Sequence, residues 1–341
     1  MREVANAVGV SPSTVSRSLR NDPRIGEATR ERVWEASQRL GYRPHPLVSA
    51  LMAQRRGGRE EGALGTIALV TDYRETDSWT TKDVCRWEFA GLEQRAGELG
   101  YRVEEFPLAS YRDRPERLRR VLRDRGIRAV LLGFERNRGR EVGGGWEDFA
   151  IAGLSAYFPE VRVDRSNFDG LFNVRLALRE MRQLGYRRTA LVVPETNNEI
   201  SGSYWSAAYQ DWLRHLPPGD RIPPFVAGEA PEEREFARWW EQTEPDSLIV
   251  YKLPVQSWLE ARGYRVPGDL GIAYLYRTER ERESAAGIDG NLVQVGGAAV
   301  DLVVSRLLTH QLGLPGTPRQ VLLEGFWCGG ETVRDRRGSD P

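Results

Sequence analysis

Residues 4–44 read VANAVGVSPSTVSRSLRNDPRIGEATRERVWEASQRLGYRP, and this stretch decides the fold of the N-terminal part of the chain. A first helix is expected over residues 2–8, with three small apolar residues on one face: Val4, Ala5 and Val8. Gly9 ends this helix, because a residue without a Cβ adopts the left-handed conformation at the lowest steric cost. Ser11 is suited to cap a second helix, with Pro12 at its first helical position. Two helices joined by so short a turn predict a helix-turn-helix.

The second and third helices continue this pattern. The second turns Val15 and Leu19 inward and leaves polar side chains outside: Ser13, Ser16, Arg17 and Arg20. The third is expected over residues 27–40, ended by Gly41, with three inward residues: Val33, Ala36 and Leu40. A generic three-helix bundle with a solvated basic face would give the same periodicity. The Arg and Ser residues on the exposed face of the second helix, where it would enter a major groove, favour a DNA-binding module instead.

The charge distribution points the same way. The chain has 341 residues, with 49 Lys+Arg and 49 Asp+Glu, so its formal net charge is zero. Residues 1–59 hold 11 Arg and five acidic residues, a net charge of +6, which leaves 38 basic and 44 acidic residues, or −6, for the remainder. A small cationic module attached to a larger anionic part is typical of a protein that meets a polyanion.

Composition excludes several other classes of protein. A hydrophobic content of 40% suits two or three globular domains rather than a disordered chain. No apolar run approaches the ~18–20 residues that span a bilayer, and residues 1–10 lack the pattern of a secretory signal. We therefore expect an intracellular, cytoplasmic protein with no membrane contact. Cys85 and Cys328 are far apart and without a CxxC motif, so neither a disulfide framework, a metal site nor a cofactor is expected.

Residues 4–44 resemble the DNA-binding headpiece of the LacI family of bacterial transcription regulators, through the segments GVSPSTVSR and TRERV followed by LGYRP. The resemblance implies that the second helix reads bases with Pro12, Ser13 and Arg17. Of these, Arg17 is able to make a bidentate contact to guanine, whereas Pro12 offers only apolar contact. The resemblance also implies that four residues contact DNA phosphates and so set the register of the headpiece on the DNA: Thr14, Ser16, Thr29 and Tyr42.

The next element implied by the resemblance is a hinge that becomes helical on operator DNA. The segment HPLVSALM, residues 45–52, aligns with it and places Leu51 as a wedge in the minor groove, where unstacking a base step is offset by the contacts of bent DNA. Pro46 and Ser49 depart from the usual hinge pattern. The same apolar residues would also suit a short amphipathic helix packed on the body. Gly-rich and charged residues 55–65 read as a linker.

Beyond the linker, short β-branched runs alternate with longer helical ones, which predicts parallel βαβ units with covered sheets. Strands are expected at residues 66–71, 102–106, 129–133, 150–154, 162–163, 189–193, 247–251 and 271–276. Helices are expected at residues 87–100, 114–125, 171–184, 206–216, 232–242 and 255–262, and the recurring ends LGY, LGY and RGY read as their C-caps. Two sequential α/β halves fit this many strands better than one sheet. A buried helix is also expected within residues 287–308.

This body resembles the periplasmic-binding-protein-like effector domain of the same family, an α/β fold of two lobes with parallel sheets. The implied organisation is a small all-α helix-turn-helix headpiece (1–44), a hinge and linker (45–62), an effector-binding and dimerisation domain (63–333) and a polar tail (334–341). Within that domain, the resemblance implies a first lobe at about residues 63–163 and 290–315 and a second at about 164–289 and 316–333. The chain would cross between the lobes near residues 163–165, 287–291 and 314–320.

The resemblance implies a ligand in a cleft at the carboxyl ends of the strands. The sugar-binding pattern of the family is changed there: Trp205 stands for an Arg, Lys252 and Leu253 for Asn-Asp, and Tyr276 and Arg277 for an acidic pair. Aromatic faces remain able to stack on a sugar, and the cations suit an acidic ligand. The alternative is a cleft that no longer binds a small molecule. The candidate effector residues are Asp72, Trp79, Asp164, Trp205, Lys252, Tyr276, Arg277, Asp289 and Asn291.

These expectations combine into one function with one rival. The first is a homodimeric transcriptional repressor that binds double-stranded operator DNA. A sugar or sugar derivative would control its affinity for the operator. A dimer is required because one headpiece reads only a half-site. The rival is a ligand-independent or architectural DNA-binding protein with a degenerate cleft. An enzyme is not expected, since the GxSxG, HExxH, GxGxxG and P-loop motifs are absent and His45, His215 and His310 lie in separate segments.

Overall fold

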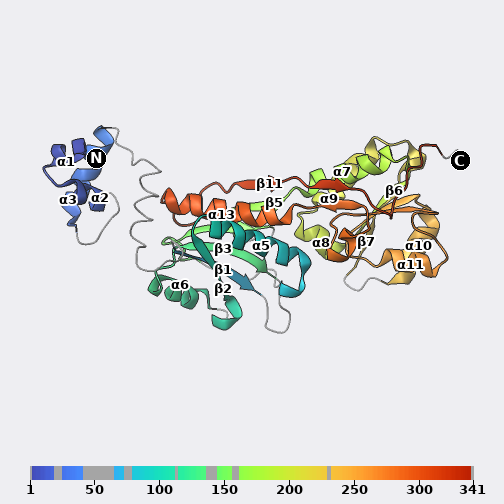
Figure 1. Cartoon of the computed structure of the whole chain (residues 1–341), viewed down its shortest axis with the longest axis horizontal. Helices are drawn as coiled ribbons and strands as arrows, with labels where there is room; N and C mark the ends of the chain where they lie inside the picture. The colour runs from blue at the N-terminus through green and yellow to red at the C-terminus, as the bar shows by residue number, and fades with distance from the viewer. Residues whose placement is uncertain are drawn as a thin grey trace. The chain divides into compact units, whose positions relative to one another are not determined.

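The structure is a computed structural model that describes residues 2–18, 25–40, 65–72, 79–111, 114–135, 144–155, 161–228 and 232–338. The chain divides into two compact units, residues 1–64 and 65–341. The first unit is a helical headpiece, and the second is an α/β body with two sheets, each covered by helices (Figure 1). This is the fold class that the sequence predicts.

The headpiece consists of α1 (Arg2–Val8), α2 (Pro12–Ser18) and α3 (Glu27–Arg39). Gly9 has a φ of +72°, so the left-handed end of α1 is confirmed. The core takes one apolar face from each helix: Val4, Ala5, Val8, Val15, Val33 and Ala36. The prediction that Leu40 points inward is wrong. Helix α3 ends one residue earlier, and the Leu40 side chain is 44% exposed.

The first lobe of the body contains a six-stranded sheet in the order β11-β5-β4-β3-β1-β2, and all its strand pairs are parallel. The strands are β1 (Gly65–Asp72), β2 (Tyr101–Pro107), β3 (Ala129–Glu135), β4 (Ala150–Leu154), β5 (Asp164–Phe168) and β11 (Gln320–Leu323). Helices α5 (Asp83–Glu98) and α13 (Leu292–Leu308) pack on one face, and α6 (Pro115–Asp124) packs on the other. Because both faces are covered, β1, β3 and β4 are almost continuously apolar.

The second lobe repeats this plan in the order β12-β10-β9-β8-β6-β7, with only β12 antiparallel to its neighbour. The strands are β6 (Thr189–Pro194), β7 (Phe225–Ala227), β8 (Ser247–Val250), β9 (Gly271–Tyr274), β10 (Gly287–Asp289) and β12 (Phe326–Cys328). Its helices are α7 (Gly170–Gln183), α8 (Glu195–Ile200), α9 (Tyr204–Arg214), α10 (Glu233–Thr243), α11 (Val255–Ala261) and α12 (Glu279–Arg282). Helices α7 and α9 cover one face, and α10 and α11 cover the other.

The expected helix ends in the body are confirmed. Gly100, Gly185 and Gly263 have φ values of +78°, +94° and +87°, so each LGY or RGY triplet ends a helix in the left-handed conformation. The expected strand at residues 162–163 is wrong, since β5 begins at Asp164. The sequence DRSNF of β5 is polar because tertiary contacts satisfy its side chains; Ser166 Oγ, for example, donates to the carbonyl of Val295 at 2.9 Å.

The chain crosses between the lobes three times. It leaves the first sheet after Phe168, returns between Asp289 and Leu292, and leaves again between Leu323 and Phe326. The expected boundaries near residues 163 and 315 are therefore too early, because β5 and β11 pair with each other in the first sheet.

Helices α5 and α13 approach each other unusually closely. A Cβ on Gly91 would lie 1.8 Å from the carbonyl oxygen of Val293, and one on Gly296 would lie 1.9 Å from the carbonyl oxygen of Glu88. Only glycine fits at these two positions, because backbone atoms rather than flexible side chains occupy the space. In the same part of α5, Glu88 bonds to Ser155, which directly follows the carboxyl end of β4.

Candidate DNA-binding helix and interlobe site

The face of α2 that the sequence assigns to base readout is open to solvent. Pro12, Ser13 and Arg17 are exposed, and Thr14 is half-exposed. Ser11 organises the start of the helix: its Oγ accepts from the backbone N of Thr14 at 3.1 Å and lies 2.8 Å from Thr14 Oγ1 and 2.7 Å from Ser13 Oγ. The predicted cap by Ser11 is confirmed.

A buried apolar contact joins α2 to the other two helices, and a polar link joins α1 to α3. Val15 of α2 is fully buried against residues of α1 and α3. Arg32 Nη2 donates to the carbonyl of Val8 at 2.7 Å and so satisfies a free backbone acceptor at the end of α1. Thr29 is half-buried in the first turn of α3. The side chain of Ser16, the phosphate candidate Tyr42 and the wedge candidate Leu51 lie outside the described residues.

Asp164 is a structural residue, which corrects its assignment to the effector site. It lies at the first residue of β5, whereas a ligand cleft would lie at the carboxyl ends of the strands. Its carboxylate accepts from Arg306 Nη1 at 3.2 Å, from Arg319 Nη2 at 2.7 Å and from the Arg319 backbone N at 2.9 Å. Burial alone would raise the pKa of Asp164, but these hydrogen bonds outweigh it and hold the pKa below its ordinary value.

Trp79 is also occupied by contacts within the first lobe. Its ring stacks on Phe134 with centroids 4.7 Å apart, and its Nε1 donates to Glu105 Oε1 at 2.7 Å. The indole N–H is therefore not available to a ligand. Asp72 is buried at the end of β1, the edge of the sheet where a ligand is expected.

Asp289 and Asn291 belong to a crossing between the lobes and hold it to its neighbours. Asp289 accepts from Arg282 Nη2 at 2.7 Å and from the backbone N of Asn291 at 3.1 Å. Asn291 Nδ2 donates to the carbonyl of Glu324 at 3.0 Å, which ties the second crossing to the third. Both side chains thus hold the crossings between the lobes in place.

Trp205 and Tyr276 pack together instead of lining an open surface. They are 2% and 6% exposed, with ring centroids 6.0 Å apart, and Phe168 contacts both at 6.4 and 4.9 Å. Asn173 joins this cluster to the third crossing, since its Nδ2 donates to Tyr276 Oη at 3.1 Å and its Oδ1 accepts from the backbone N of Gly325 at 2.8 Å. Burial raises the pKa of Tyr276 well above its ordinary value. These aromatic side chains fill space where the family resemblance implies sugar contacts.

Arg277 lies beside this cluster and is turned toward the backbone of its own lobe. Its Nη1 donates to the carbonyl of Ala285 at 3.3 Å.

Three residues with a left-handed backbone conformation lie at the same ends of the strands. Phe134 is the penultimate residue of β3, Ser155 directly follows β4, and Lys252 lies two residues after β8; each is a non-glycine residue with a φ between 51° and 55°. Such left-handed residues are uncommon and cost conformational energy, which surrounding structure must supply. Ser155 and Lys252 also share a partner that the sequence analysis missed, Glu88.

Glu88 lies on α5 and is completely buried. Its Oε1 accepts a short hydrogen bond from Ser155 Oγ, while its Oε2 has no hydrogen-bond partner. Burial raises the pKa of Glu88 to about 8, although the hydrogen bond from Ser155 and the positive charge of Lys252 lower it. A signal for this residue was present in the sequence, because Glu88 falls between Cys85 and Leu92 on the apolar stripe of its helix.

The two lobes touch next to Glu88. Arg86 Nη2 forms an ion pair with Glu279 Oε2 at 3.0 Å, and the guanidinium of Arg282 lies 4.0 Å from the centre of the Trp87 ring. Both contacts join α5 of the first lobe to α12 of the second. We call Glu88, Ser155 and Lys252 the interlobe polar group.

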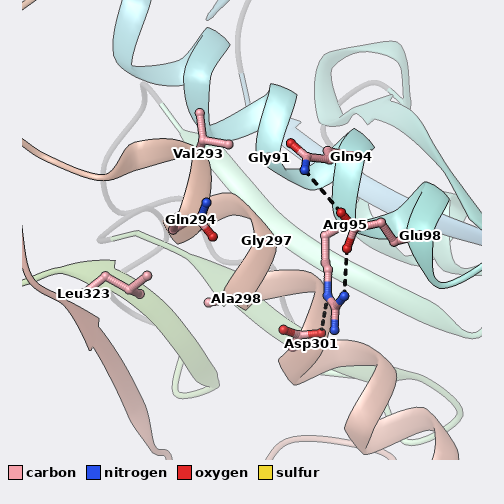
Figure 2. A pocket seen from close by; sticks show the side chains of 10 residues that line it. All are labelled: Gly91, Gln94, Arg95, Glu98, Val293, Gln294, Gly297, Ala298, Asp301 and Leu323. Carbon is pink, nitrogen blue, oxygen red and sulfur yellow. Dashed lines mark hydrogen bonds and ion pairs between the residues drawn. The ribbon is translucent and has the colours of Figure 1, made fainter.

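A separate groove of about 350 Å³ runs between α5 and α13 on the first lobe (Figure 2). Figure 2 shows Arg95 at one end, bonded to Asp301 at 2.8 Å and to Glu98 at 2.7 Å. The small residues Gly297 and Ala298 form part of its wall. This groove lies along the outer surface of the helix pair and includes none of the candidate effector residues.

The described parts of the chain contain no cluster of three or more His, Cys, Asp or Glu residues that would hold a metal ion. Among the same residues, none of the helices is both long and apolar enough to cross a membrane.

Comparison with known proteins gives a family match for the headpiece. Residues 1–45 match the family model "Bacterial regulatory proteins, lacI family". The "HTH-type transcriptional regulator AglR" of Rhizobium meliloti (strain 1021) is 28% identical over 210 residues, which cover 56% of this chain and 51% of AglR. The chain spans between about a third and a half of the length of the first curated relatives it matches.

Two solved structures share the fold of the whole chain. The lac repressor dimer bound to operator and the anti-inducer ONPF is 17% identical with a TM-score of 0.58, and the match covers 97% of this chain and 98% of that one. The "transcriptional regulator CelR-cellobiose complex" is 18% identical with a TM-score of 0.55 and the same coverage. At these identities the similarity concerns the fold.

Proposed function

We propose that the chain is a lacI-family transcriptional regulator that binds double-stranded operator DNA as a homodimer. The proteins that it matches are transcriptional regulators rather than enzymes. The observation that carries the proposal is the exposed face of α2 with Pro12, Ser13 and Arg17, inside a headpiece that the family model matches. One headpiece reads a half-site, so two copies are required. Repression is the mode of regulation proposed.

The proposed organisation keeps the headpiece at residues 1–44 and the hinge and linker at residues 45–62. Leu51 is the proposed minor-groove wedge. Thr14, Ser16, Thr29 and Tyr42 are the proposed phosphate contacts, which position the headpiece without reading sequence.

We propose that a sugar or sugar derivative controls operator affinity from the interlobe site. Ligand that binds one arrangement of the lobes better than another shifts the population toward it and so changes the geometry of the hinges. Lys252, Arg277 and the aromatic pair Trp205 and Tyr276 are the proposed contacts, together with Asp72. The solved CelR complex, whose fold this chain shares, contains cellobiose and supports a sugar-type ligand.

A second candidate function is favoured by one observation, the burial of Trp205 and Tyr276. Aromatic side chains that fill the interlobe region would leave a DNA-binding protein without small-molecule control. A thermal-shift screen against neutral and acidic sugars, followed by operator release, separates the two functions. A ligand that raises the melting temperature and changes operator affinity excludes the second function, whereas unchanged operator affinity across the panel excludes the first.

The DNA-binding proposal is tested on a duplex selected from a random library by repeated binding. Arg17→Ala should weaken binding by about 1–3 kcal/mol and relax the preference at one base pair. Arg39→Ala, which removes an exposed charge from α3, is the matched control. Equal loss on the selected duplex and on an unrelated duplex would mean that Arg17 contacts phosphate only.

The hinge is tested separately through the proposed wedge. Leu51→Ala should lower affinity for the selected duplex more than affinity for an unrelated one, because the wedge acts only where the DNA bends. Equal losses of affinity for the two duplexes would show that Leu51 is not the minor-groove wedge.

A further inference from the structure

We propose that the interlobe polar group recognises the anionic oxygen group of a small hydroxylated ligand, a carboxylate or a phosphate, between Glu88 of the first lobe and Lys252 of the second. The proposal rests on the effector-controlled form of the proposed function and names the chemistry of its ligand.

The first observation is the state of the Glu88 carboxyl group. Its Oε1 is held by Ser155, and its Oε2 is buried without a partner. An unpaired polar atom in a protein interior is unfavourable, so a ligand atom that pairs with Oε2 would be stabilised there. Gly296 lets the backbone of α13 lie directly against the Glu88 carbonyl, which holds this turn of α5 in position.

The second observation is the position of Lys252 on the other lobe. Its side chain is exposed, and Asp83 and Cys85 of α5 act on its charge, so the group lies near the first lobe. Burial alone would lower the pKa of Lys252, but the neighbouring Tyr251, Cys85 and Asp83 raise it above its ordinary value. Its Nζ lies 5.0 Å from the centre of the Tyr251 ring. Lys252 therefore stays cationic over the whole physiological range.

The two groups together select the charge of the ligand. At neutral pH the Glu88 carboxyl is protonated, because burial raises its pKa to about 8, so Oε2–H is a donor. Lys252 is a second, charged donor. Two donors, one of them cationic, suit an oxygen anion, whereas the charge of Lys252 would repel an amine. The Ser155 hydroxyl is the remaining polar neighbour, and among the described residues Lys252 is the charged group that acts on Glu88.

Isothermal titration calorimetry with three probes tests the proposal. Gluconate supplies a carboxylate, glucose 6-phosphate supplies a phosphate, and glucose is the neutral control. At pH 7 at least one anion should bind at least tenfold more tightly than glucose, and Lys252→Met should remove that preference. The better of the two anions identifies the group. Glucose binding as tightly as both anions would overturn the proposal.

The role of Glu88 is tested by the pH dependence of gluconate binding, since gluconate does not titrate between pH 7 and 9. Affinity should fall several-fold over this range as Glu88 becomes an anion, and Glu88→Gln, which keeps a donor but cannot ionise, should abolish the fall. If Glu88→Gln does not fold, Ser155→Ala should move the fall to higher pH. An unchanged pH profile in the folded variant would remove Glu88 from the site.

Binding to the selected DNA duplex is measured on the same samples. If no probe binds while DNA binding is intact, the ligand inference fails and the DNA-binding function stands. If DNA binding is absent but an anion binds, the proposed function fails instead.

Discussion

Asp164 and Glu88 are both buried carboxyl groups of the first lobe, but they lie at opposite edges of its sheet. Asp164, at the amino end of β5, meets two arginines, and its pKa is held below its ordinary value. Glu88, beside the carboxyl ends of the strands, has one hydroxyl partner and a pKa of about 8. A fully paired buried charge holds structure together, whereas a half-paired one is a candidate for binding.

The largest effect is expected from removing the paired carboxylate. Asp164→Ala leaves Arg306, which is 3% exposed, as a buried charge without its carboxylate, and should lower the free energy of unfolding by about 3–5 kcal/mol in urea titrations. Arg319→Ala is the control, because its side chain is 63% exposed and its removal still leaves Asp164 bonded to Arg306. Equal losses in the two variants would contradict the structural role of the buried pair.

The next effect concerns the glycine that positions Glu88. Gly296→Ala puts a Cβ 1.9 Å from the Glu88 carbonyl oxygen, so α5 and α13 must separate, at a cost of about 1–3 kcal/mol in the free energy of unfolding. Gly297→Ala is the matched control, because its Cβ would meet the Arg95 side chain at 3.6 Å and the Gly91 carbonyl oxygen at 3.9 Å, both ordinary van der Waals distances. A loss in Gly297→Ala as large as that in Gly296→Ala would rule out the close helix contact.

The two carboxyl groups should also respond to pH in opposite directions. Between its ordinary pKa of 4.5 and about 8, Glu88 is protonated in the folded protein and ionised in the unfolded chain. The contribution of Glu88 to the free energy of unfolding therefore falls as pH rises through this window, by up to about 1.4 kcal/mol per pH unit. The contribution of Asp164 is instead lost as pH falls through and below its ordinary value of 3.8.

Glu88→Gln makes this comparison measurable. Urea titrations from pH 5 to 8 should show a shallower decline in the variant than in the wild type, because the amide does not titrate. Parallel declines would mean that the folded protein ionises Glu88 in the ordinary range.

The smallest effect is expected at the partner of Glu88. Ser155→Ala removes one buried hydrogen bond and should lower the free energy of unfolding by about 1 kcal/mol. Because the Ser155 hydroxyl lowers the pKa of Glu88, its loss should also move the pH window upward. A downward shift of the window in the same titrations would contradict the assignment of the donor.

Much of the fold was predictable because local rules act on few residues. Gly9, Ser11 and Pro12 specify the first turn of the headpiece by their own conformational preferences, and Gly100, Gly185 and Gly263 end helices for the same reason. The polar strand β5 could not be predicted, since its Asp and Ser are satisfied by residues more than a hundred positions away. The prediction for Leu40 was wrong because hydrophobic periodicity does not show at which residue a helix ends.

The residues of the candidate site were also predictable only in part. Trp205, Lys252 and Tyr276 were found because a family pattern marks their positions, but Asp164 was placed in the wrong site because its position near a strand did not say which end of that strand it occupies. Glu88 was missed, although a charged residue on an apolar helical stripe is a visible irregularity.

The sequence by itself determined a cationic helix-turn-helix attached to an α/β body, because helix caps, turn glycines and hydrophobic periodicity act over a few neighbouring residues. Only the tertiary structure decided which polar side chains are paired inside that body. The charge state of a buried group depends on partners brought from distant segments: two arginines at Asp164, and one hydroxyl and a lysine of the opposite lobe at Glu88.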